Sequence, residues 1–227
     1  GSAVDRSRNI VRRLTTGVGF LLQKNKVTQI EGDAIIKDGS TIEIQGVEPH
    51  TITADNIIIA TGGRPIHVPG IDVDGETILT YPEAVVLKEV PARIVIVGGG
   101  PIGVEFADIY HSYGSEVTII EMLPRLVPLE DEEISRQLER SFKKRRLKFM
   151  TGTKVSDVKV NSGVAVVNLE DSAGKTTSIE CNKVLVAIGI QANTTGLGLE
   201  SLDLEMDRSF IRVDDGLQTN VAGVYAI

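Results

Sequence analysis

Apolar positions near the start of the chain repeat every three or four residues, which is the spacing of an amphipathic helix. They lie along one side of a helix expected over residues 3–24: Ile10, Leu14, Val18, Leu21 and Leu22. Short alternating segments follow, separated by turns that contain glycine, at residues 27–30, 34–36, 41–44 and 51–53. Of these turns, Asp38-Gly39 is the strongest hairpin signal. The pattern therefore predicts a helix followed by an antiparallel meander.

Two continuous apolar runs that stop at glycines predict strands buried on both faces, and such strands belong in a parallel sheet. The first run is residues 56–63, and the second is residues 93–97. A short helical segment is expected between them, near residues 81–88. After the second run the pattern predicts a helix, a strand, a charged helix and a strand, at residues 101–113, 116–120, 131–146 and 147–150. This β-α-β-α-β order is the unit of a doubly wound parallel sheet.

The succession of a meander and a buried strand occurs twice. The second meander is predicted at residues 154–160, 164–169 and 177–180, and the second buried strand at residues 183–189. That strand ends Ala187-Ile188-Gly189, as the earlier one ends Ala60-Thr61-Gly62. We therefore expect an α/β fold: a Rossmann-like dinucleotide-binding domain, with a parallel sheet, helices and a β-meander, flanked by incomplete pieces of a second, related domain.

The composition is that of an ordinary globular protein with an acidic balance of charge. The 227 residues are 41 % hydrophobic and carry 24 Lys and Arg against 31 Asp and Glu, for a net charge of −7. This charge argues against a nucleic-acid-binding protein, and the basic run at residues 143–146 is interpreted as the solvated end of a helix. No apolar stretch approaches the roughly 20 residues that span a membrane. We expect a cytoplasmic protein, or one of the mitochondrial matrix in a eukaryote, and we interpret the single cysteine, Cys181, as a buried or incidental thiol.

The candidate chemistry begins at the glycines after the second buried run, which form the pattern Gly98-x-Gly100-x-x-Gly103. Such a pattern between a buried strand and a helix predicts a loop that binds a dinucleotide, and Gly99, Pro101 and Ile102 complete that loop. The first glycine permits the tight turn, the second lets the backbone approach a diphosphate, and the third lets helix and strand pack closely. The N–H groups at the start of the helix would then bind the phosphates.

Glu121 lies eighteen residues after Gly103, at the end of the next predicted strand. A carboxylate at this position accepts hydrogen bonds from both ribose hydroxyls of NAD, whereas the 2′-phosphate of NADP would meet a like charge. We therefore expect NAD to bind in preference to NADP. Two other residues keep alternative interpretations: Arg125 is either a cation for a phosphate or a turn residue, and Glu105 is either a helix-start carboxylate or a catalytic residue.

Five separated blocks of the chain resemble motifs of the pyridine nucleotide-disulfide oxidoreductases, in the order found in that family. They are residues 56–63, 95–105, 117–136, 184–199 and 219–227, and the third is similar above all to the lipoamide dehydrogenase branch. The resemblance implies an enzyme that oxidises dihydrolipoamide, carried on acyltransferase or glycine-cleavage carrier proteins. Electrons would pass through a redox disulfide and FAD to NAD⁺.

The resemblance also implies roles for particular residues. Gly98 to Gly103 would hold the NAD diphosphate, Glu121 the adenine ribose, and Val155 and Gly189 would line the adenine and nicotinamide ends. Glu105 would lie near the flavin and the nicotinamide. Contacts with FAD are expected from residues of the first module: Ala34, Thr61 and Gly62.

By the same resemblance, several parts of the family's fold are expected outside this chain. These are the flavin-binding glycine loop, the Cys-x-x-x-x-Cys redox pair, and the C-terminal dimerisation domain with its His-Glu base. We therefore expect a central fragment of a homodimeric parent, with no catalytic or metal-binding residues of its own and no activity in isolation. Its three histidines are interpreted as surface or packing residues: His50, His67 and His111.

One departure from the family pattern lies inside the chain. Many members carry Gly-Arg-x-Pro-Asn where this chain has Gly189 to Asn193 without an arginine, so any loop contact that needs this guanidinium is in question. The expected domains are a partial FAD-binding domain at residues 3–88, an NAD-binding domain at 89–208 and a return to the first domain at 209–227. Two alternatives stay open: another flavin disulfide reductase, such as a mercuric reductase or a pyridine nucleotide transhydrogenase, and a non-catalytic nucleotide-binding module.

Overall fold

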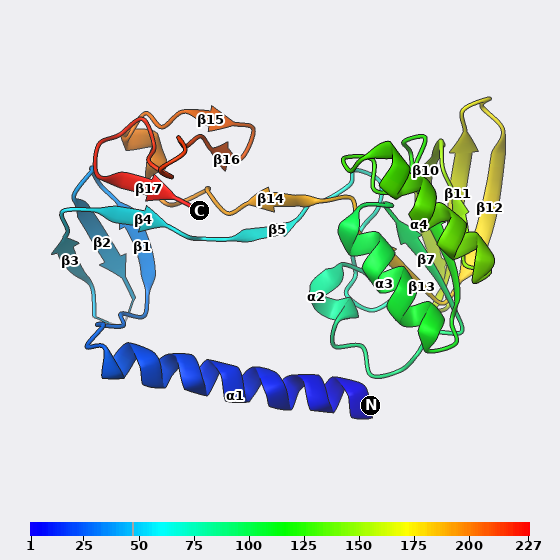
Figure 1. The fold of residues 1–227 in the computed structure, drawn as a ribbon, viewed down its shortest axis with the longest axis horizontal. Helices are drawn as coiled ribbons and strands as arrows, with labels where there is room; N and C mark the ends of the chain where they lie inside the picture. The colour runs from blue at the N-terminus through cyan, green and yellow to red at the C-terminus, as the bar shows by residue number, and fades with distance from the viewer. Residues whose placement is uncertain (47) are drawn as a thin grey trace. The chain divides into compact units, whose positions relative to one another are not determined.

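The computed structural model describes residues 1–46 and 48–227 and divides them into two compact units. Unit 1 comprises residues 1–9 and 65–189, and unit 2 comprises residues 10–64 and 190–227. The division falls within helix α1 (Ser2–Lys24), as labelled in Figure 1. Each unit is described by itself.

Unit 1 is built on a sheet of five strands, all parallel to their neighbours. In spatial order they are β6 (Ile78–Leu79), β13 (Lys183–Val186), β7 (Arg93–Val97), β8 (Glu116–Ile120) and β9 (Lys148–Met150). The chain proceeds outward from β7 to β8 and β9 and then returns to the other side of β7 with β13. The strand order thus reverses beside β7, and ligands bind outside the carboxyl ends of the strands at such a reversal.

Two different layers cover the faces of this sheet. Helices α3 (Pro101–Ser112) and α4 (Glu132–Lys144) lie on one face, and the antiparallel strands β10 (Thr153–Asn161), β11 (Val164–Asp171) and β12 (Thr176–Cys181) lie on the other (Figure 1).

The side chains of β7 show how both faces are buried. Ile94 and Ile96 pack in one cluster with Ala107 of α3, while the alternate residues Val95 and Val97 pack in a second cluster with the meander. The prediction of a strand buried on both faces is therefore confirmed for β7.

Unit 2 has smaller sheets. Strands β1 (Asp33–Ile36), β2 (Thr41–Gln45) and β3 (His50–Thr53) form the predicted antiparallel meander, and β4 (Ile57–Ile59) pairs in parallel with β17 (Val224–Ala226). The remaining elements are β5 (Gly63–Pro65) beside β14 (Ile190–Ala192), β15 (Met206–Asp207) beside β16 (Phe210–Ile211), and the 3₁₀ turn Leu199–Ser201. Its core consists of Ile36, Ile57, Ile59, Leu199, Val224 and Ala226.

Three predicted elements differ from the structure. Residues 27–30 form no strand. An alternating pattern of apolar and polar residues does not by itself provide a strand to pair with, and Val27 and Ile30 are exposed and pair with no strand among the described residues. Strand β4 is not buried on both faces, since β17 is its one partner in the described chain and Ile58 is 65 % exposed. The helix expected near residues 81–88 is limited to α2 (Tyr81–Ala84), and two β-branched valines, which disfavour helix, follow it.

The segments beside the expected domain boundaries divide between the two compact units. Residues 65–88 belong with unit 1, because β6 adds a parallel strand beside β13. Residues 190–208 belong with unit 2, because Leu199 packs against Ile36 in its core. The glycine loop thus lies in unit 1, and the domain boundaries expected from the sequence stay a prediction.

Helix α1 has the predicted extent, but none of its residues is buried. Its apolar positions are exposed, Leu14 by 65 % and Val18 by 56 %. Within the described ranges no helix is both long enough and apolar enough to cross a membrane.

Candidate functional site

The glycine loop leaves the carboxyl end of β7, and two of its glycines are required by close backbone contacts. Gly98 has φ +110°, and a Cβ there would overlap the carbonyl group of Ala187 at the end of β13. A Cβ on Gly103 would overlap the carbonyl oxygen of Gly98. The glycine at position 98 therefore allows the turn after β7 to lie against the end of β13. The glycine at position 103 allows the start of α3 to pack directly against the end of β7.

Gly100 is required for neither reason, since no atom lies within 4 Å of where its Cβ would be. It is the N-cap residue of α3, with φ −74°, and Pro101 follows it. No side chain caps this helix, and its first turn has no acidic residue. No intrahelical carbonyl satisfies the N–H groups of Ile102 and Gly103, so the positive end of this helix, with open space at Gly100, has the features of a phosphate site.

Glu121 lies at the end of β8, beside the glycine loop, and is 8 % exposed. Its Oε2 accepts a hydrogen bond from the N–H of Gly99 at 2.6 Å, and its Oε1 accepts one from the N–H of Leu123 at 2.7 Å. An ionised carboxylate accepts about four hydrogen bonds. These two bonds fix the orientation of the carboxylate and leave each oxygen able to accept one more donor.

Arg125, four residues further on, is committed to its own loop. Its Nη2 donates to the carbonyl oxygens of Pro128 at 3.0 Å and Glu130 at 3.4 Å. The structure thus favours the interpretation of Arg125 as a turn residue over that of a cation for a phosphate.

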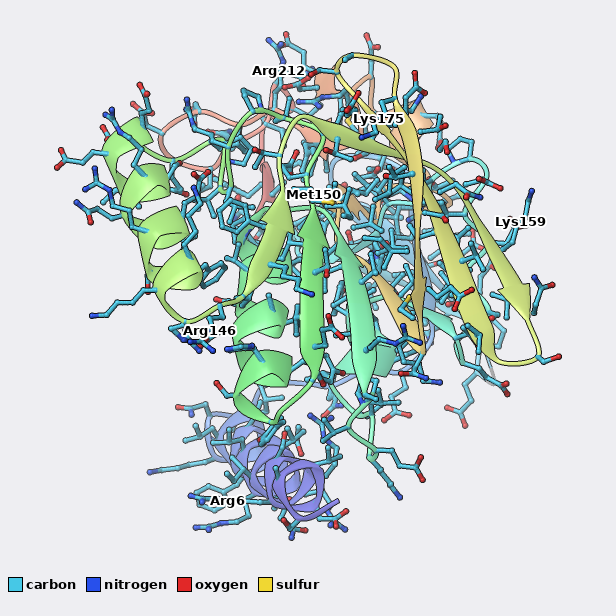
Figure 2. All side chains as sticks on the ribbon, turned by 90° about the vertical axis from the view of Figure 1, so that its right-hand side faces the viewer. Arg6, Arg146, Met150, Lys159, Lys175 and Arg212 are labelled. Atoms are coloured by element: carbon cyan, nitrogen blue, oxygen red, sulfur yellow. The ribbon has the colours of Figure 1, made fainter. Side chains whose placement is uncertain are left out.

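The other predicted NAD contacts also lie in unit 1. The N–H groups of Glu121 and Thr153 pair across this edge with the carbonyl oxygens of Met150 and Glu121, at 2.8 and 3.0 Å. Figure 2 labels Met150 at the end of β9. Val155 follows on β10, partly buried, and Gly189 lies two residues after Ala187. Glu105 is on the exposed side of α3.

The residues expected to contact FAD lie in unit 2. Ala34 is in β1, Thr61 and Gly62 follow β4, and all three are exposed. The hydroxyl of Thr61 donates to the carbonyl oxygen of Asn193 at 2.7 Å. The side chain of Asn193 accepts a hydrogen bond from the guanidinium of Arg64 at 2.8 Å. This loop, which lacks the family's arginine after Gly189, thus contacts a guanidinium from the first module.

Cys181 is buried at 1 % exposure, and burial raises the pKa of its thiol. The prediction of a buried thiol is confirmed. Within the described ranges, no three His, Cys, Asp or Glu side chains are arranged to hold a metal ion.

Residues 2–227 match the protein family described as pyridine nucleotide-disulphide oxidoreductase. The chain belongs to this family. Among curated members, the dihydrolipoyl dehydrogenase of Chlorobaculum tepidum is 42 % identical over 99 % of the chain, and that of Rhizobium etli is 40 % identical over 100 % of it. The chain spans about half the length of these relatives, 48 % and 50 % respectively. Family membership implies FAD and NAD(P) as cofactors without deciding between NAD and NADP.

Two solved structures have the same fold. The crystal structure of LpdA from Mycobacterium tuberculosis aligns with a TM-score of 0.87 at 27 % identity, over 98 % of this chain and 50 % of that one. The HOCl-induced flavoprotein disulfide reductase RclA from Escherichia coli aligns with a TM-score of 0.86 at 24 % identity, over 99 % and 51 %. The predicted α/β fold class is thereby confirmed.

Sequence reasoning missed the segment that lies over the glycine loop. Leu126 is fully buried, and its Cδ2 would be 2.6 Å from a Cβ on Gly99. The N–H of Val127 donates to the carbonyl oxygen of Gly99 at 2.7 Å. A signal for this segment was present, since Pro124 and Pro128 flank a short segment that contains the apolar pair Leu126-Val127.

Proposed function

We propose that this chain binds NAD(H) through the glycine loop and Glu121, as the nucleotide-binding part of a dihydrolipoyl dehydrogenase. One observation carries the proposal: an uncapped helix N-terminus with open space at Gly100 adjoins a buried, oriented carboxylate with spare acceptor capacity. The first feature suits a diphosphate and the second suits ribose hydroxyls, so the residues present fit the dinucleotide.

In this proposal Gly98 to Gly103 hold the diphosphate and Glu121 holds the adenine ribose. Val155 and Gly189 line the two ends of the coenzyme, and Glu105 lies near the nicotinamide. A 2′-phosphate placed about 4 Å from Glu121 would meet a repulsion of roughly 4 kcal/mol per pair of unit charges at an effective dielectric near 20. Because Arg125 bonds to its own loop, its guanidinium is not positioned to offset that repulsion. The proposal is therefore specific for NAD over NADP.

For the whole protein we propose the activity that the names of its relatives state, that of a dihydrolipoyl dehydrogenase. In this reaction dihydrolipoamide and NAD⁺ would be converted to lipoamide, NADH and a proton. Bound NAD⁺ supplies the hydride acceptor. Ala34, Thr61 and Gly62 would contribute to the FAD site. A homodimeric parent, lipoamide carried on acyltransferase or glycine-cleavage proteins, a cytoplasmic location and inactivity of residues 1–227 alone belong to the same proposal.

Titration of the protein with NADH and NADPH, followed by calorimetry, tests the nucleotide assignment. We expect NADH to bind more tightly by a factor of about 100 or more, the equivalent of roughly 3 kcal/mol. Comparable affinity for the two nucleotides would remove the role of Glu121, and binding of neither would overturn the proposal as a whole.

A further inference from the structure

We propose that a brace of four residues, Leu126, Val127, Ser135 and Glu139, positions the glycine loop for its diphosphate. This inference rests on the proposed function, because the brace contacts the loop and not the nucleotide. The four residues come from the turn after Glu121 and from the first two turns of α4.

The first step is that the two peptide groups that flank the Cα of Gly99 are both held by hydrogen bonds. Its N–H donates to Glu121, and its carbonyl oxygen accepts the N–H of Val127 at 2.7 Å. Leu126 fills the space beside its Cα, where a Cβ would be 2.6 Å from the leucine Cδ2. The next residue along the chain is Gly100, at the open end of α3, so the orientation of the Gly99 peptide decides where the following N–H groups point.

The second step is that side chains of α4 bind the turn at Leu126 and Val127, and this turn in turn contacts Gly99. The hydroxyl of Ser135, a side chain with no exposure, donates to the carbonyl oxygen of Val127 at 3.2 Å. The N–H of Leu126 donates to Oε1 of Glu139 at 3.2 Å. Asp131 begins this helix by accepting the N–H of Glu133 at 2.7 Å, which fixes the turn of α4 that carries Ser135.

The third step is the backbone of Val127, which has φ +42° and is 7 % exposed. It is the one β-branched residue with positive φ in the part of the chain that the structure describes. A β-branched residue enters this region only where its surroundings over-determine it, and such positions cluster at functional sites. Here the conformation directs the Val127 N–H at Gly99, and the Val127 carbonyl oxygen accepts hydrogen bonds from the Ser135 hydroxyl at 3.2 Å and from the N–H of Glu130 at 3.0 Å. Both polar groups of this residue therefore take part in the brace.

The test is a double variant, Ser135→Ala with Glu139→Ala, which removes both side-chain contacts of the brace and leaves every residue of the glycine loop unchanged. Two matched controls use the same helix. Glu139→Gln keeps an oxygen acceptor for Leu126, and Arg145→Ala removes the ion pair with Asp108 of α3 at the far end of α4.

Each lost hydrogen bond is expected to weaken NADH and ADP binding by roughly two- to tenfold, and the double variant by about four- to a hundredfold. Adenosine, which has no phosphate, should bind as it does to the parent protein in an NMR titration. In the free double variant the amide protons of Gly99 and Gly100 should exchange with solvent faster. The Glu139→Gln variant should keep the parent affinity for NADH, and Arg145→Ala should lower the melting temperature without changing that affinity.

The outcomes separate the brace from the proposed function. Failure of the parent protein to bind NADH overturns the proposed function itself. If the parent binds NADH, two results overturn the brace alone. The first is an NADH affinity of the double variant that equals that of the parent. The second is an equal loss of NADH affinity in Arg145→Ala, which would show that any loosening of α4 weakens binding.

Discussion

Two glycines three residues apart in the same loop are predicted to respond oppositely to the same added methyl group. Gly100→Ala places a Cβ where no atom lies within 4 Å, at a φ of −74° that alanine adopts freely. We expect the free energy of unfolding of this variant to differ from that of the parent by under about 1 kcal/mol. The one unfavourable effect expected is that alanine is a less favourable N-cap residue than glycine. The methyl group occupies the space in which a phosphate would meet the helix N-terminus, so one charge-assisted hydrogen bond, about 1.5–3 kcal/mol, is lost.

Gly103→Ala is the matched comparison. Its Cβ overlaps the carbonyl oxygen of Gly98, a backbone atom that moves only if α3 moves away from the strand. Overpacking of this kind costs roughly 3 kcal/mol, and the helix preference of alanine over glycine returns at most about 1 kcal/mol. We therefore expect this variant to be about 2 kcal/mol less stable than the parent protein.

Urea unfolding and NADH titration of both variants provide the measurements. Gly100→Ala should unfold like the parent and bind NADH about 10- to 150-fold more weakly, while Gly103→Ala should show a lower unfolding midpoint. Parent-like NADH binding by Gly100→Ala would refute the placement of the diphosphate at this helix end. Parent-like stability of Gly103→Ala would refute the close seating of α3 on β7.

Two further predictions concern buried side chains of unit 1. Burial raises the pKa of Tyr110 to about 12, and its hydroxyl donates to the carbonyl oxygen of Ala84 at 2.9 Å. Tyr110→Phe should therefore cost about 1 kcal/mol at neutral pH. Because the unfolded tyrosine ionises near pH 10, the parent protein should lose roughly 2–3 kcal/mol between pH 10 and 12 that the variant keeps. Urea unfolding across this range should show the Phe variant becoming the more stable of the two, and a constant difference would contradict the buried phenol. Cys181 should react with a thiol reagent at least about a hundredfold more slowly in the native protein than in urea, because reaction requires opening of the core. Similar rates in the two states would show that the thiol is accessible.

The local sequence pattern correctly predicted those elements that pack against other elements predicted by the same kind of pattern. The continuous apolar run before Gly98 predicted a strand with two buried faces, and β7 has them, because helices and a meander are both encoded within the following hundred residues. The positions of the three loop glycines and of Glu121 at the ends of two neighbouring strands could likewise be predicted, because their spacing along the chain matches one strand, one helix and the next strand. The equally apolar run before Gly62 predicted the same burial and failed, because the described chain gives β4 one strand partner and leaves Ile58 exposed.

Only the tertiary structure decided what surrounds those readable residues. Nothing in the local pattern states that Glu121 turns both oxygens to backbone N–H groups, or that Arg125 bonds to its own loop. The sequence likewise does not show that Val127 reaches back across 28 residues to Gly99. Such contacts join segments that are distant in sequence. They form only when the segment after β8, which contains Leu126 and Val127, and α4 are packed over the end of β7. Periodicity reports which face of an element is buried, whereas hydrogen-bond partners depend on how the elements are assembled.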